Sequence, residues 1–179
     1  VFDYAAEVPK LAKDLMERFW PGPLTIILPV KPGVFPANVN NDQETVAFRM
    51  PNQHSALRLI DLVGAPLVGP SANLSGKPSP TSVDHVMQDF DGVRGGVVAG
   101  DTDQAQIGVE STVVRPMSDR LIILRPGAIT QSMLKQVCPK VQEFSVAEQL
   151  AAPQLQSPGV KYRHYSAKQA VFLFESSED

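Results

Sequence analysis

The chain has 179 residues and a formal net charge of -3, so its overall charge does not favour bulk binding to nucleic acid. Hydrophobic residues make up 43% of the sequence, enough for one substantial core. A single cysteine, Cys138, excludes an internal disulfide framework and a zinc site built from cysteines. The sequence has no apolar run of membrane-spanning length and no signal-type segment, so it predicts a cytoplasmic protein without membrane contact.

Apolar residues recur at helical spacing in some segments and form short or alternating runs, typical of strands, in others. The expected elements in chain order are a helix at 8–19, strands at 24–30 and 45–50, a helix at 57–63, a strand at 66–69, a helix at 81–90, strands at 95–100, 111–116 and 120–126, and a helix from 130 to 137. Some neighbouring strands have no helix between them, which indicates an α/β fold with a mixed sheet flanked by helices.

The helix at 81–90 has the spacing of a capping box between Thr81 and Asp84, and its apolar residues are expected to be buried. Periodicity fades after position 141, so residues 1–141 are expected to form one domain and 142–169 a linker. Residues 170–179 resemble the first strand of a second, truncated α/β domain.

The stretch GPSANLSGKPSPT at 69–81 places Ser71, Asn73 and Ser79 on a stiff loop between an expected strand and a helix. Hydroxyls, an amide and backbone N–H groups in such a loop can bind phosphate or carboxylate oxygens. The alternative is a well-capped connection, because these are ordinary turn residues. The loop differs from GxxxxGK[ST], since a proline follows its Gly-Lys pair and the first glycine of that spacing is absent.

Two arginines at strand ends are further candidates for an anion site. Arg49 shares a strand face with Thr45, and a guanidinium can clamp a carboxylate by two hydrogen bonds, although it could equally lie on an open sheet face. Ser111 and Arg125 would lie near the same end of the sheet if their strands pair as a hairpin. Glu110 is interpreted as a solvated or capping residue rather than a catalytic one.

The stretch SPGVKYRHY at 157–165 combines basic and aromatic side chains. It could close over a nucleotide as a lid, contact RNA, or be a solvated charge run. His54 and His85 have no metal-ligand spacing with each other or with His164, so no metal site is expected.

Five motifs together resemble the YrdC-like family of threonylcarbamoyl-AMP synthases. FWPGPLTIIL, VAFRMP, GPSANLSGKPSPT, GVESTVV and LRPGAI occur in the family's order, over roughly residues 8–135. SPGVKYRHY resembles the linker that leads to a second domain in the family's long form. The resemblance implies a twisted mixed β-sheet around a concave site.

The resemblance also implies the function. The family converts L-threonine, bicarbonate and ATP to threonylcarbamoyl-adenylate and pyrophosphate, and the product supplies the tRNA threonylcarbamoyl transferase machinery. ATP would be a substrate with Mg2+, without a tightly bound organic cofactor or a protein metal site. The implied ATP-binding residues are Thr45, Ser71, Asn73, Ser79, Arg125 and Tyr165, and the implied threonine-binding residues are Arg49, Gly69 and Ser111. No catalytic residue is assigned.

The family's leading segment, with its Lys-x-Arg pair, has no counterpart in this sequence, so this polypeptide alone is expected to be inactive. Two other functions are compatible with the sequence. One is a carbamoyl-transfer domain of the hydrogenase maturation type, against which the single cysteine argues. The other is a non-catalytic RNA-binding module.

Overall fold

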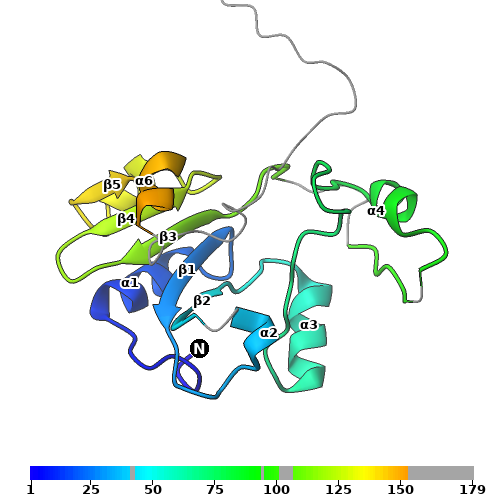
Figure 1. Cartoon of the computed structure of the whole chain (residues 1–179), viewed down its shortest axis with the longest axis horizontal. Coiled ribbons are helices and arrows are strands. Elements are labelled where there is room, and N and C mark those ends of the chain that lie inside the picture. Colours follow the sequence, from blue (N-terminus) through cyan, green and yellow to red (C-terminus); the bar gives the residue numbers. More distant parts are fainter. Residues whose placement is uncertain (41–42, 94, 101–106, 153–179) are drawn as a thin grey trace, which may run out of the picture.

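The computed structural model describes residues 1–40, 43–93, 95–100 and 107–152. Five strands form one mixed sheet in the order β2-β1-β3-β4-β5 (Figure 1). They are β1 (Leu24–Pro29), β2 (Thr45–Phe48), β3 (Thr112–Pro116), β4 (Leu121–Arg125) and β5 (Val141–Glu143). The pairs β1–β3 and β4–β5 are parallel, whereas β1–β2 and β3–β4 are antiparallel. The predicted mixed sheet is therefore confirmed, and so is the hairpin of 111–116 with 120–126.

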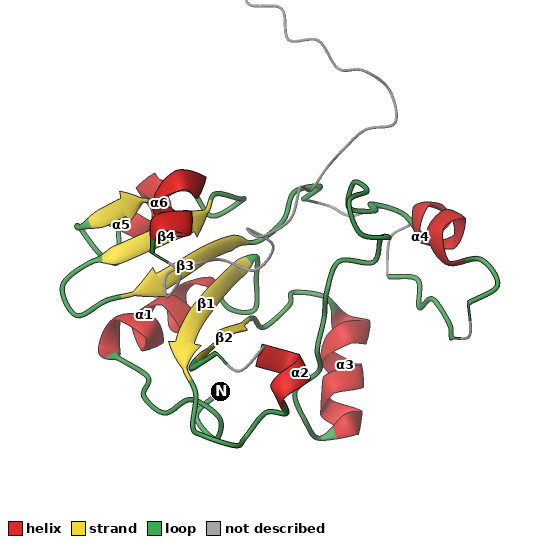
Figure 2. Cartoon of the chain, in the orientation of Figure 1, coloured by secondary structure: helices red, strands yellow, loops and turns green. Residues whose placement is uncertain are grey.

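In chain order the helices lie before, between and after these strands, and some of them stand apart from the sheet (Figure 2). They are α1 (Lys10–Phe19), α2 (Ala37–Asn40), α3 (His54–Val63), α4 (Val83–Phe90), α5 (Gln131–Lys135) and α6 (Val146–Ala151). The expected helices at 8–19, 57–63, 81–90 and 130–137 are confirmed as α1, α3, α4 and α5, whereas α2 and α6 were not expected. Within the described ranges, none of these helices is long and apolar enough to cross a membrane.

The core fills both faces of the sheet. On one face, Leu15 of α1 and Leu134 of α5 pack with strand residues such as Ile26, and all three side chains are fully buried. On the other face, Ile27 and its neighbours on β3 and β4 form a smaller cluster with Phe144. Helix α6 lies beside β4 and β5, where the Gln149 side chain donates hydrogen bonds to main-chain carbonyls (Figure 1). Apolar burial on both faces holds the strand ends in fixed positions.

Two predicted strands are wrong. Residues 66–69 and 95–100 are irregular, and no ladder within the described residues includes them. Their apolar side chains are largely exposed, with Val68 at 69% and Val98 at 77%. Strand formation by short apolar runs depends on packing and on a hydrogen-bonding partner more than on residue type, and here neither is supplied.

The start and the burial of α4 also differ from expectation. The N-cap is Ser82 rather than Thr81, since the Ser82 hydroxyl accepts a hydrogen bond from the His85 N–H. None of the residues of α4 is fully buried, and Met87 is 42% exposed. The segment that carries α4 extends away from the sheet in Figure 2, so its apolar stripe lacks the sheet face that buries α1.

The expected linker does not begin at position 142. Residues 141–143 form β5, which pairs with β4, and residues 146–151 form α6. The Ser145 side chain and Glu148 cap that helix reciprocally, and this Ser-x-x-Glu spacing is a helix-start signal that is visible in the sequence. The rest of the expected linker and the expected second domain, from residue 153 onward, lie outside the described residues.

Candidate functional site

One edge of the sheet collects polar side chains from four strands. Register pairs Leu24 with Thr112 and Val113 with Arg125, so β1 and β3 begin at the edge where β4 ends. Strand β2 runs antiparallel to β1 and also ends there, so Arg49 follows directly from its last residue. The hairpin therefore brings Ser111 and Arg125 to one end of the sheet, as predicted, and Arg49 lies at the end of β2 on the same edge.

Ser111 lies at the centre of this edge. Its hydroxyl is 2.7 Å from the Thr25 hydroxyl, and both residues are buried. The Arg125 guanidinium donates through Nη2 to the Ser111 carbonyl at 2.9 Å and to the Ser111 hydroxyl at 3.2 Å. Its Nε donates to the same carbonyl at 3.2 Å. These contacts fix the orientation of Arg125 before any ligand arrives.

The turn after β4 holds the main chain of this edge in place. Ile129 exchanges two hydrogen bonds with the Thr112 hydroxyl, donating from N at 3.0 Å and accepting at O at 2.8 Å. Gly127 packs directly against the chain before β3. A Cβ there would lie 2.7 Å from Thr112 N and 2.5 Å from Glu110 O, so only glycine fits this position.

Arg49 lies near enough to Arg125 for the charge of Arg125 to act on it. Partial desolvation, and secondly the positive charge of Arg125, lower the pKa of the Arg49 guanidinium. A guanidinium remains protonated at neutral pH even so, because its ordinary pKa is very high. Two like charges held close together at a sheet edge repel, and an anion bound beside them would relieve that repulsion. The edge is therefore suited to binding a carboxylate or phosphate.

A shallow depression of about 320 Å³ lies beside Arg49. Residues 64–66 form part of its wall, and these residues lead from α3 into the loop that contains Gly69. The volume is at the low end of the roughly 300–1,000 Å³ that ligand pockets span. The depression is therefore large enough for a small molecule, and its lining includes both a cationic residue, Arg49, and an acidic one, Asp3.

Glu110 links the 69–81 loop to the sheet edge. The Ser79 hydroxyl donates to Glu110 Oε1 at 2.8 Å, and both residues are half-buried. Glu110, interpreted from the sequence as a solvated or capping residue, is half-buried and accepts a hydrogen bond from Ser79. This carboxylate lies next to Ser111 in the chain and adds negative charge to an edge that otherwise holds cations.

The other predicted site residues are dispersed. Gly69 and Ser71 lie on an exposed stretch of loop, and no hydrogen bond within the described ranges joins them to the sheet edge. Asn73 donates hydrogen bonds inside its own loop, to Leu74 O at 2.9 Å and to the Lys77 carbonyl at 3.1 Å. Thr45 lies at the opposite end of β2 from Arg49.

Tyr165 and the rest of the expected lid at 157–165 lie outside the described residues. Across the described ranges, no three His, Cys, Asp or Glu side chains gather closely enough to hold a metal ion.

Two polar features of the site were not predicted. Thr25 interrupts an apolar buried strand, and a polar residue in such a run is a usable signal, because it must find a partner in the core. Asp89 forms an ion pair with Lys77, and the two residues meet only because the chain folds back between the loop and α4. No local sequence pattern predicts this pair.

Two family models match the chain. One, described as telomere recombination and covering Sua5, YciO and YrdC, matches residues 1–127. The other, described as the C-terminal domain of threonylcarbamoyl-AMP synthase, matches residues 129–179. Together they agree with the resemblance seen in the five motifs.

Similar proteins carry consistent names. A threonylcarbamoyl-AMP synthase of Bacillus subtilis is 44% identical over 99% of this chain, and one of Pyrococcus abyssi is 40% identical over 98%. The chain spans about half the length of these relatives, 50% and 51% respectively.

Solved structures share the fold. The crystal structure of P. abyssi Sua5 complexed with L-threonine superposes with a TM-score of 0.82 at 40% identity, over 91% of this chain and 47% of that one. E. coli YciO, at 21% identity and a TM-score of 0.55 over 71% of this chain and 60% of that one, supports the fold alone. The family model over residues 1–127 and the relatives that match nearly the whole chain lead to one conclusion: the chain belongs to the Sua5/YciO/YrdC family.

Proposed function

We propose that this chain provides the active site of an L-threonylcarbamoyladenylate synthase. The reaction joins L-threonine, bicarbonate and ATP into threonylcarbamoyl-adenylate, with release of pyrophosphate and water. The names of relatives at 40–44% identity support this assignment. The observation that carries it in the structure is the convergence of Arg49, Ser111 and Arg125 at one edge of the sheet.

Arg49 is proposed to bind the carboxylate of threonine, with Gly69 and Ser111 beside the amino acid. Partial burial, and secondly the charge of Arg125, lower the pKa of Arg49, so an anionic partner would stabilise its charged form. The depression next to it has room for an amino acid. P. abyssi Sua5, whose fold this chain shares, has been solved with L-threonine.

ATP is proposed to bind across the 69–81 loop and the Arg125 edge. The residues proposed to contact it are Thr45, Ser71, Asn73, Ser79, Arg125 and Tyr165. Adenylate formation depends on holding the phosphates in line and stabilising the charge that develops on them. Arg125 is already oriented by Ser111, and Ser79 by Glu110, which supports this role for them. Magnesium would enter with the nucleotide, as part of the Mg-ATP substrate.

The product, a mixed anhydride, would be passed to the machinery that modifies tRNA. A cytoplasmic location is proposed as well, because the one cysteine, Cys138, is free and buried, as suits a reducing compartment. Direct contact with RNA remains a further proposal, which residues 157–165 would provide.

The test is pyrophosphate release, with L-threonine, bicarbonate and ATP, by the full chain, meaning this polypeptide joined to a leading segment that carries the family's Lys-x-Arg pair. This polypeptide alone is expected to be inactive in the same assay. Release should require all three substrates, and mass spectrometry should detect threonylcarbamoyl-adenylate. Pyrophosphate release that is independent of threonine would contradict the proposal. RNA affinity with a steep salt dependence but without ATP chemistry would support a binding module instead.

A further inference from the structure

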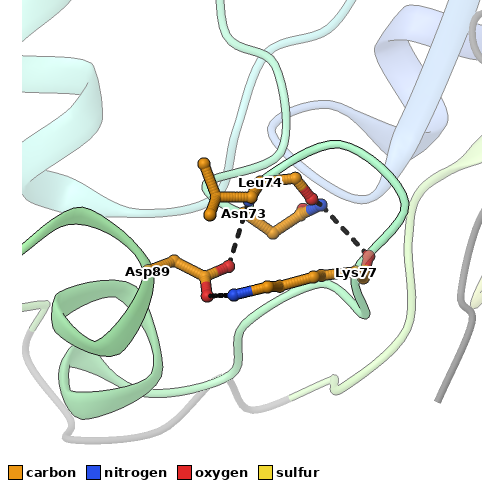
Figure 3. Close-up of polar contacts among 4 residues, drawn as sticks. All are labelled: Asn73, Leu74, Lys77 and Asp89. Carbon is orange, nitrogen blue, oxygen red and sulfur yellow. Dashed lines mark hydrogen bonds and ion pairs between the residues drawn. The ribbon is translucent and has the colours of Figure 1, made fainter. Parts of the chain in front are cut away.

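Asp89, an acidic residue of α4, contacts the 69–81 loop, the candidate nucleotide-binding loop. Asp89 Oδ2 accepts a hydrogen bond from the Leu74 N–H at 3.0 Å, and its Oδ1 pairs with Lys77 Nζ (Figure 3). The Asp89 side chain is 11% exposed and that of Lys77 is 38% exposed. A carboxylate this well buried makes a stronger contact than an ordinary surface ion pair, which contributes little.

Asn73, a residue of the same loop, stabilises it by hydrogen bonds within the loop. Its Nδ2 donates to the carbonyls of Leu74 and Lys77, while the Lys77 N–H donates to Leu74 O at 3.0 Å. Gly76 has a φ of 86°, as the third residue of a type II turn requires. Both partners of the Asn73 nitrogen are carbonyl oxygens, which fixes the orientation of the amide. Asn73 Oδ1 is buried and has no partner among the described residues.

We propose that Asp89 is a positioning residue for the nucleotide site, and that Lys77 is its structural partner rather than a phosphate ligand. This inference rests on the proposed function, because the nucleotide comes from there. Ser71 and Ser79 flank the turn that Asp89 and Asn73 hold, so a fixed turn presents their hydroxyls in a fixed arrangement. A loop that is ordered before binding avoids the entropy cost of being ordered by the ligand.

The position of Lys77 argues against the alternative role. Its ammonium is already neutralised by Asp89, and the same carboxylate binds the Leu74 N–H. If Lys77 moved to a phosphate, the largely buried Asp89 carboxylate would lose this ion pair, which is costly. The Gly-Lys pair is similar to phosphate-binding loops in sequence only.

The two roles predict opposite changes in ATP affinity for the Asp89→Asn variant. If Lys77 binds phosphate and Asp89 competes for it, Asp89→Asn frees the lysine and tightens ATP binding. If Asp89 positions the loop, Asp89→Asn loosens the turn and weakens ATP binding. We expect a loss of about 5- to 20-fold, because the ion pair is partly exposed and therefore partly screened.

The experiment compares Asp89→Asn, Lys77→Met and the double variant in the full chain, with Asp84→Asn as the matched control on the exposed side of α4. In the ligand-free protein, amide exchange at residues 71–79 should accelerate in the Asp89 and Lys77 variants but not in the control. KM for ATP should rise, whereas kcat and KM for threonine should change less than about twofold. The double variant should bind ATP no more weakly than the single variant with the lower ATP affinity, because both substitutions break the same ion pair.

Several outcomes would overturn the positioning role. One is amide exchange at 71–79 that is unchanged in Asp89→Asn, and another is ATP binding by this variant that is tighter or unchanged. The third is an equal loss of affinity for ATP and for threonine together with a lower melting temperature. Failure of the proposed function itself is distinguishable. In that case the unaltered protein would neither bind ATP nor release pyrophosphate, whereas the exchange measurement would still report whether Asp89 orders the loop.

Discussion

At the residue scale, Arg49 is the side chain whose proposed role can be isolated best. It is exposed, it follows the end of β2, and its neighbour Arg125 is occupied with Ser111. Arg49→Ala should weaken threonine binding by about 2 kcal/mol, roughly 30-fold, since a charge-assisted contact to the carboxylate is lost. Arg49→Lys should restore only part of this, because an ammonium cannot form two parallel hydrogen bonds. Calorimetric titration with threonine measures both.

The matched control for Arg49 is Arg58→Ala. Arg58 is an exposed arginine on α3 whose partner is Asp61, so its removal should leave threonine affinity within about twofold. Equal loss of ATP and threonine affinity in Arg49→Ala would contradict the role proposed for Arg49.

Gly127 is a second test at this scale. Gly127→Ala should lower the free energy of unfolding by about 1 to 3 kcal/mol and displace Ser111, because the new methyl group would collide with the main chain at Thr112. Gly96→Ala is the control, since a Cβ at Gly96 has nothing within 4 Å and should change stability by less than about 0.5 kcal/mol. Urea unfolding of both variants decides this, and equal midpoints would show that the turn can shift to make room.

At the element scale, α6 depends on one buried amide. Gln149 is 1% exposed, and its Nε2 donates to Leu124 O at 2.6 Å and to Phe144 O at 3.2 Å. Gln149→Leu should cost about 1 to 3 kcal/mol of unfolding free energy, because the two carbonyls lose that donor within an apolar setting. Gln88→Leu, at an exposed position of α4, should be nearly neutral. Similar unfolding midpoints for the two variants would mean that α6 packs on the sheet without help from this amide.

At the scale of the whole molecule, burial is divided unevenly. The central strands β1, β3 and β4 are almost fully buried, whereas residues 64–72 and 95–100 are mostly exposed. Amides of Ile26, Val114 and Ile123 should therefore exchange with solvent only through global unfolding, and those of the two loop segments much faster. Exchange measured by mass spectrometry on the full chain tests this, and equal protection of the loop segments would contradict it.

The sequence by itself determined the elements whose signals are local. The helical spacing before Pro21, the buried run at 24–30 and the Thr130 cap all depend on neighbours within a few residues, and all are confirmed. The five motifs likewise identified the family, because their order does not depend on three-dimensional contacts. Ser111 and Arg125 could be proposed as neighbours because a hairpin register follows from strand alternation and a short turn, whereas Arg49 was placed beside Ser111 through the family resemblance.

Only the tertiary structure decided the features that depend on partners distant in the chain. Val68 and Val98 have strand-like side chains but are not in strands, because pairing and burial, which no local pattern encodes, are missing around them. Asp89 lies on the helix that follows the loop, 12 residues after Lys77, and reaches Lys77 only because the chain folds back between them. The physical reason is common to both cases. Local patterns fix backbone preference, whereas the choice of partner depends on which groups folding brings into contact and removes from water.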